Sequence, residues 1–141
     1  MDVKINFRNI KYTLKEINYK HIEATIENLE VKVYDTVIPT NISNVGFDLI
    51  FERKLEFVPN KLFNVSLEYL VECLFDDEGI KYFNSNQERI EDFIERSRIG
   101  IVNALPIVPQ SSLIIAQITG LSNPKPLVLP PTLKDPYKPA Q

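Results

Sequence analysis

The longest uncharged stretch of this chain runs for 26 residues, from Ile99 to Pro124, although a quarter of the whole sequence is charged. Its length is sufficient to span a bilayer. Two prolines, Pro106 and Pro109, interrupt it, and no cluster of Lys or Arg marks its ends. We therefore expect a buried part of a folded domain rather than a membrane span. The stretch also contains the polar residues Asn103, Gln110, Ser111, Ser112, Gln117 and Thr119.

The centre of this stretch, residues 113–118, is apolar on nearly all sides at helical spacing. A helix on the surface of a protein needs only one apolar stripe. We therefore expect this helix to be covered partly by a sheet and partly by another subunit or a bound chain. The residues predicted to lie in an interface between copies are Leu113, Ile114, Ile115 and Ile118.

Length and composition limit the classes of protein to consider. The 141 residues suit one domain, residues 1–121, followed by a segment, 122–141, that contains six of the ten prolines and is expected to be extended on the surface of the domain. A net charge of −3 without a basic run argues against a nucleic-acid surface. One cysteine excludes an intramolecular disulfide, and the first residues do not resemble a signal peptide, so we expect a cytoplasmic protein.

Two segments alternate strictly, which predicts half-buried antiparallel strands. In residues 45–57 every odd-numbered position is apolar except Arg53, and in residues 62–75 every odd-numbered position from 63 onward is apolar. The intervening residues 59–61 predict a hairpin turn. Residues 3–7 and 12–17 alternate with a slip between them that suggests a bulge or bend, and Leu29, Val31 and Val33 alternate before Pro39. Together these segments predict a four-stranded, mostly antiparallel sheet.

The period changes from two to helical after Phe75. Residues 76–79 predict a turn, and Ser85 with Glu88 predicts a capping box that starts a helix ending at Pro106. A second helix is expected from near Pro109 to Gly120. The predicted class is therefore α+β, with the helices packed on one face of the sheet.

The sequence offers little support for catalysis. His21 has no neighbouring nucleophile or second ligand, and Cys73 lies at an apolar strand position. No spaced set of His and Cys could hold zinc, and the four glycines form no phosphate-binding loop, so we expect no enzyme activity, metal or cofactor. An acidic turn in solvent is the favoured interpretation of residues 76–78. Two interpretations of the apolar surface remain: an ordinary core with a dimer interface, which composition alone favours, or a groove for extended apolar peptides.

The order of these features resembles that of the SecB family of protein-export chaperones. Residues 12–19, with one inserted residue, and residues 29–36 look like the first two strands of that family, and residues 45–75 look like its third and fourth. Residues 105–120 resemble its long helix, and residues 126–130 its apolar segment after that helix. The resemblance implies an ATP-independent chaperone that binds unfolded polypeptides, including preproteins, and assembles as a homotetramer, a dimer of dimers.

The resemblance also implies where clients bind. In the family, long grooves are lined by the sheet, by the crossover after the first strand and by the segment after the helix. The corresponding residues here are Tyr19, Ile22, Ile26, Phe63, Leu127, Val128 and Leu129. If the post-helix segment is extended, Leu127 and Leu129 point one way and Val128 the other, so that one side packs on the core and the other lines the client channel.

Three departures from the family pattern bear on partners. Export members carry acidic residues that dock the ATPase SecA; Glu16 matches one such position, but Lys20 stands at the second. The last helix of the family has no counterpart here, and the net charge is modest. Some SecB-like proteins instead guard the antitoxin of a toxin–antitoxin pair, which suits a shortened member. An adaptor with a single folded partner remains the alternative from a different class.

Overall fold

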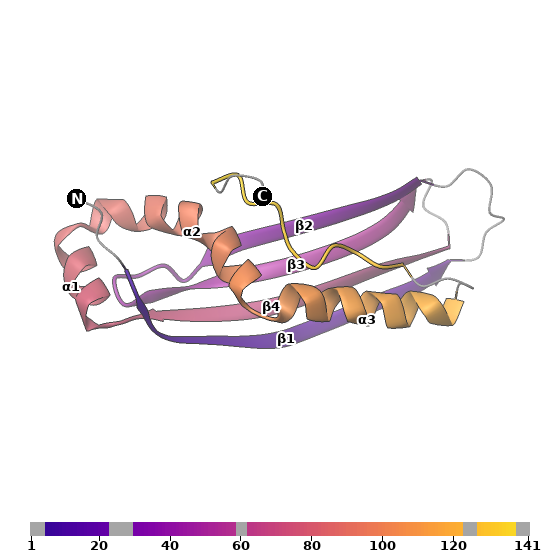
Figure 1. Cartoon of the computed structure of the whole chain (residues 1–141), viewed down its shortest axis with the longest axis horizontal. Coiled ribbons are helices and arrows are strands. Elements are labelled where there is room, and N and C mark those ends of the chain that lie inside the picture. Colours follow the sequence, from indigo (N-terminus) through magenta and orange to yellow (C-terminus); the bar gives the residue numbers. More distant parts are fainter. Residues whose placement is uncertain (1–4, 23–29, 59–61, 123–126, 138–141) are drawn as a thin grey trace.

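The computed structural model describes residues 5–22, 30–58, 62–122 and 127–137, except for the side chains of residues 21, 22, 58, 62, 121 and 122. Four strands form one antiparallel sheet in the order β1-β4-β3-β2 (Figure 1). This confirms the predicted four-stranded antiparallel sheet of an α+β fold. The strands are β1 (Phe7–Ile22), β2 (Glu30–Thr40), β3 (Gly46–Val58) and β4 (Leu62–Phe75).

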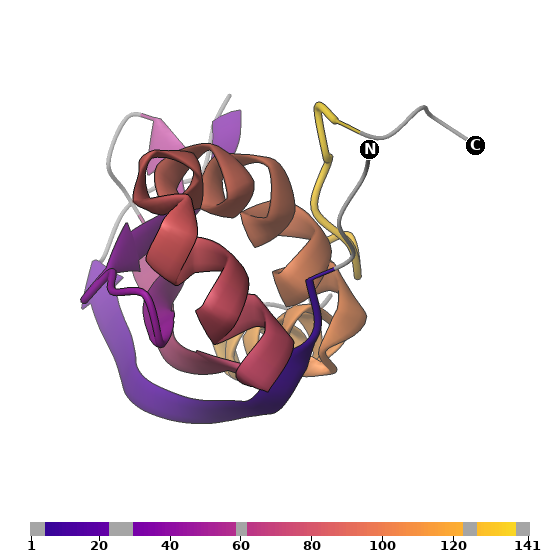
Figure 2. The same ribbon diagram turned by 90° about the vertical axis from the view of Figure 1, so that its left-hand side faces the viewer.

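The helices follow the sheet in the sequence and lie on one side of it, within its curve (Figure 2). They are α1 (Asp77–Ser85), the 3₁₀ turn η1 (Gln87–Arg89), α2 (Ile90–Ala104) and α3 (Ile107–Ser122). Among the described residues, no single helix is long and apolar enough to cross a membrane. The pair Gln87–Ala104 and Ile107–Gly120, bent by 57° at the break, meets the length and composition criteria only when taken together.

The alternation in the sequence determines which face of the sheet is buried. On β4, all odd-numbered residues from Phe63 to Phe75 are buried beneath the helices, and on β3 the odd-numbered residues from Phe47 to Phe57 are buried as well. Strict period-two patterning fixes the face because a slip of one residue would expose every one of these side chains. The predicted core faces of β3 and β4 are therefore confirmed.

Strand β1 contains two irregularities that keep its apolar residues on the helix-covered face. The register shifts between Phe7 and Asn9 and again between Leu14 and Glu16. The second shift allows even-numbered Leu14 to face the same side as odd-numbered Ile17, opposite Tyr69 and Leu67 respectively. The slip expected between the two halves of this strand is the first of these shifts.

Two local predictions after Phe75 are wrong. Residues 76–79 do not form a free turn, because Asp76 is the N-cap of α1 and its Oδ1 accepts a hydrogen bond from the Gly79 amide at 2.8 Å. Ser85 and Glu88 form no capping box, because Ser85 is the last residue of α1 and η1 begins without a side-chain cap. A helix that begins with an N-cap and acidic residues in its first turn has the same sequence pattern as an acidic turn. The helical region after Phe75 therefore begins earlier than the periodicity predicted.

Candidate functional site

The sheet has two apolar margins that the helices leave uncovered. A helix is about 10 Å wide, which is close to the width of two strands, so α3, which packs on β4, is too narrow to cover all four strands. Cross-strand neighbours show the result: Leu67 on β4 is buried, whereas Ile17 beside it on β1 is 46% exposed. We define the β1 margin as Tyr12, Leu14, Ile17 and Tyr19, and the β2 margin as Val31 and Val33; all six are between 36% and 46% exposed.

Both margins lie on the same face of the sheet as the core. Tyr19 pairs with Val65 and Val33 pairs with Leu55, and both of these partners are fully buried. Exposed side chains on this face thus continue the apolar surface of the core outward to each edge. Such a surface can bury the apolar side chains of a bound chain, which is the main favourable term in polypeptide association.

The residues predicted to line the client groove differ in how exposed they are. Tyr19 is partly exposed and its ring lies 5.7 Å from that of Phe63, measured between centroids. Phe63 itself is buried and also contacts Phe57, so it belongs to the hydrophobic core and does not form an exposed wall of the predicted groove. Ile26 and the side chain of Ile22 lie outside the described residues, as does the side chain of His21.

The exposed side of α3 is narrower than expected from its composition. Ile115 is fully buried within the single chain, so it cannot contact a partner, and its assignment to an interface is corrected. Ile114 and Ile118 are half-buried against the core, and Leu113 is 60% exposed. The rest of the chain thus covers α3 on more sides than the sequence indicated. Among the described side chains of α3, the other exposed residues are Pro109, Gln110, Gln117 and Gly120.

The segment after α3, residues 127–133, is here called the tail segment. It runs between α3 and β2 (Figure 1). Leu129 is buried and Leu127 is half-buried, whereas Val128 is 77% exposed, which is the alternation expected for an extended segment. The described part therefore lies on the domain, with Leu129 and Leu133 in the core and Val128 facing outward.

Arg53 connects the tail segment to the sheet and to α3. Its side chain is fully buried; Nε and Nη2 donate to the Asp35 carboxylate at 2.8 and 3.1 Å. Nη1 donates to Ser112 Oγ at 2.7 Å and to the Pro130 carbonyl at 2.9 Å. A buried charge requires such partners. The partners of Arg53 are not evident from the sequence, although a single arginine in an otherwise apolar alternating set indicates a buried charge.

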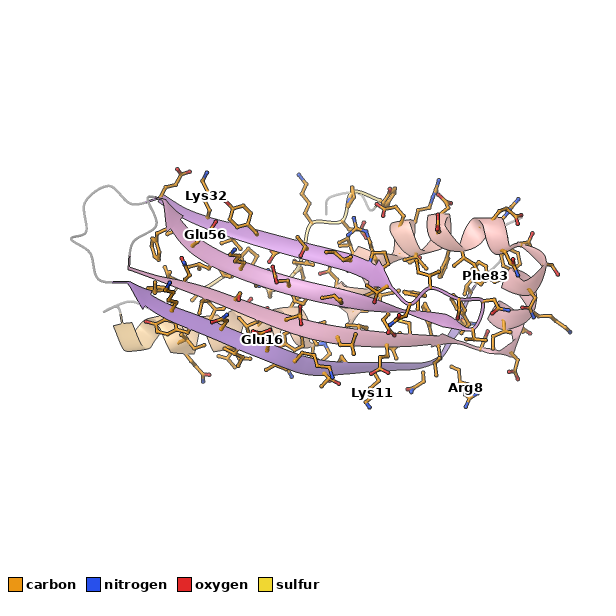
Figure 3. The ribbon with its side chains drawn as sticks, turned by 180° about the vertical axis from the view of Figure 1, so that it is seen from behind. Arg8, Lys11, Glu16, Lys32, Glu56 and Phe83 are labelled. Carbon is orange, nitrogen blue, oxygen red and sulfur yellow. The ribbon has the colours of Figure 1, made fainter. Side chains whose placement is uncertain are left out.

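The outer face of the sheet carries charged residues, among them the candidate docking residue Glu16, together with the exposed apolar side chains of Tyr34, Ile38 and Leu74 (Figure 3). Glu16 and Glu52 both pair with Glu68, so three carboxylates lie side by side across three strands. Lys20 lies at a shallow depression with Lys54, close to this row. Arg8 and Lys11 extend from the free edge of β1, where charges oppose edge-to-edge pairing with other sheets.

Metal-binding and thiol chemistry have no support among the described residues. No group of three or more His, Cys, Asp and Glu side chains in the described part is placed to hold a metal ion. Cys73 is buried, and desolvation, with a smaller contribution from the nearby charge of Asp48, raises its pKa to about 12. The thiol is therefore protonated at neutral pH, and a protonated thiol is a poor nucleophile.

Comparison with known proteins supports a fold but no family. No protein family model matches the chain, and no curated protein matches it. Among solved structures, it is similar to the Mycobacterium tuberculosis SecB-like chaperone Rv1957, solved in complex with a ChAD peptide from the Rv1956 HigA1 antitoxin. The TM-score is 0.50 at 13% identity, and the match covers 89% of each chain. At this identity the likeness concerns the architecture, and the chain therefore has a SecB-like α+β fold.

Proposed function

We propose that this protein is an ATP-independent chaperone that holds unfolded or non-native polypeptides on its apolar surface. The observation that carries the proposal is the pair of apolar margins on the helix-covered face of the sheet. Exposed valine, leucine, isoleucine and tyrosine side chains offer apolar contacts on β1 and β2, the two edge strands of the sheet in the described part of the chain. Unfolded chains supply complementary apolar side chains, so one surface can accept many sequences.

The SecB-like fold supports this proposal, because the similar protein Rv1957 is described as a chaperone. That protein was solved with a peptide from an antitoxin, which favours a second candidate function: a chaperone dedicated to one antitoxin. The two functions differ in breadth. A general chaperone protects several unrelated proteins, whereas a dedicated one protects a single partner, and an adaptor for a folded partner protects none.

The test is the suppression of aggregation of several unrelated denatured proteins, with and without ATP. We expect suppression that is independent of ATP. Failure with every client would contradict general holding, and suppression confined to an antitoxin would favour the dedicated function. Protection that required ATP would contradict the proposed mechanism.

A matched pair of variants on β1 locates the client surface. Ile17 belongs to the β1 margin, whereas its neighbour Asn18 pairs with Ser66 on the outer face. Ile17→Asp should weaken client binding by about 1–3 kcal/mol, because an apolar contact is lost and a charge is placed against apolar groups. Asn18→Asp should leave affinity nearly unchanged, and both variants should keep their melting temperature. Equal effects of the two changes would argue against the β1 margin as a client surface.

We also propose that the protein associates with itself, and that Leu113 with the flanking Ile114 and Ile118 takes part in the contact. The exposed part of α3 is a further surface that the described part of the chain leaves uncovered, with Leu113 60% exposed. Delivery of clients to SecA would use the acidic row that includes Glu16 on the opposite face, so holding and delivery would use different sides of the sheet.

A further inference from the structure

The domain binds the tail segment through the main chain of that segment. The Leu127 amide donates to Thr119 Oγ1 of α3 at 2.8 Å. The Leu133 amide donates to Asn103 Oδ1 of α2 at 2.7 Å, and Asn103 Nδ2 donates to the Leu133 carbonyl at 2.9 Å. Between these two points, the Pro130 carbonyl accepts hydrogen bonds from Arg53 Nη1 at 2.9 Å and Ser112 Oγ at 3.0 Å.

Because these side chains contact main-chain atoms, the polar contacts place little restriction on the sequence of the bound segment. The remaining contacts are apolar: Leu129 and Leu133 are buried, and Leu127 is half-buried against the core. The arrangement therefore accepts an extended segment with apolar side chains at suitable spacing. It combines main-chain hydrogen bonds with apolar pockets, which are the two components of recognition of extended peptides.

Three of the four polar side chains that hold the tail segment, those of Thr119, Ser112 and Arg53, also have partners within the domain. Thr119 Oγ1 lies 2.8 Å from the Ile115 carbonyl, and Ser112 Oγ lies 3.1 Å from the Val108 carbonyl. Arg53 keeps both hydrogen bonds to Asp35. Departure of the tail segment would therefore leave these donors with partners, which avoids the full penalty of unsatisfied buried groups. Replacement by a segment of similar chemistry would restore the lost apolar contacts.

We propose that the channel lined by Arg53, Asn103, Ser112 and Thr119 is a binding site for extended apolar segments of client polypeptides. The tail segment occupies this channel as an internal competitor. This inference rests on the proposed chaperone function and adds a regulatory element, because clients must displace the tail segment. The apparent affinity of the channel for a client is then reduced by the fraction of molecules in which the channel is free.

The test measures binding of a fluorescent peptide with the sequence of residues 127–134 to full-length protein. Leu129→Asp should release the tail segment and strengthen peptide binding by about tenfold if the channel is occupied in roughly nine molecules out of ten. Val128→Asp makes the same change at the exposed neighbour and should bind as weakly as the unmodified protein. A control peptide with aspartate in place of its three leucines should not bind.

A second variant keeps the test decisive if Leu129→Asp lowers the melting temperature. Leu127→Asp changes a half-buried residue of the tail segment and leaves all four lining residues in place, and it should strengthen peptide binding to a smaller degree. The proposal is overturned if folded Leu127→Asp and Leu129→Asp proteins bind the peptide no better than Val128→Asp. Aggregation suppression that persists with that outcome would leave the chaperone function in place and reject only the competitor role of the tail segment.

Discussion

At the scale of single residues, Arg53 differs most from its surroundings. It is a fully buried cation at an alternating position otherwise occupied by apolar side chains, and it joins β2, α3 and the tail segment through Asp35, Ser112 and Pro130. Buried ion pairs often add little net stability, but removing one partner of such a pair destabilises strongly because the other is left uncompensated. Arg53 thus determines how these elements meet, whatever its net contribution to stability.

Arg53→Met should lower the free energy of unfolding by about 3 kcal/mol, because the Asp35 carboxylate loses the charge that pairs with it and the Pro130 carbonyl keeps only its hydrogen bond from Ser112. The double variant Arg53→Met with Asp35→Leu should recover most of that loss, since no charge is left unpaired. Urea unfolding of the single and double variants measures both quantities. A single variant as stable as the unmodified protein would show that the pair does not stabilise the packing of these elements.

At the scale of elements, the junction between β4 and α1 shows how one side chain changes a turn into a helix. Asp76 is extended at φ −74° and ψ 176°, and its carboxylate accepts the Gly79 amide. Asp77 and Glu78 follow in the first turn, where negative charge interacts favourably with the helix dipole. The start of α1 therefore explains the acidic residues 76–78. Further along the same helix, the buried Phe83 packs into the hydrophobic core.

Asp76→Ala should destabilise the protein by about 1 kcal/mol through loss of the N-cap. Asp77→Ala is the matched control, because it removes the same charge from the same helix start but leaves the cap hydrogen bond in place. The difference between the two variants in thermal unfolding isolates the cap. If both variants melt at the same temperature, the hydrogen bond from Gly79 to Asp76 does not contribute to stability.

At the scale of the whole molecule, the sheet is wider than the helices that cover it, and the uncovered surface lies at both edges and on the outer side of α3. The long helix is largely accommodated by its own chain, since Ile115 is buried and Ile114 and Ile118 are half-buried. An interface between copies would therefore centre on Leu113, and we expect it to depend on few residues.

Leu113→Asp should dissociate the proposed oligomer, because a charge would be placed in the middle of the contact. Val128→Asp introduces the same charge at an apolar residue of the tail segment that is even more exposed, and it should leave the oligomer intact. Light scattering at micromolar protein concentration measures the mass of each variant. A monomeric mass for the unmodified protein would contradict self-association.

Period and composition were sufficient to predict the α+β class, the buried faces of β3 and β4, and the alternation from Leu127 to Leu129. These properties are local, because side-chain direction in an extended chain follows sequence position. Only the tertiary structure decided that Ile115 and Phe63 are buried in the core of one chain, and that β1 and β2 lie at the edges of the sheet.

The channel that holds the tail segment was also decided only by the tertiary structure. In the sequence, three polar residues of the uncharged stretch show no common role: Asn103, Ser112 and Thr119. In the structure, all three contact the tail segment where α2, α3 and β3 meet around it. Residues that are 30 positions apart in the sequence, such as Asn103 and Leu133, come together through packing of elements, and no periodicity in the sequence encodes that pairing. The sequence by itself therefore determined which faces are apolar, whereas packing determined which apolar surfaces stayed exposed, because coverage depends on the relative widths and positions of the elements.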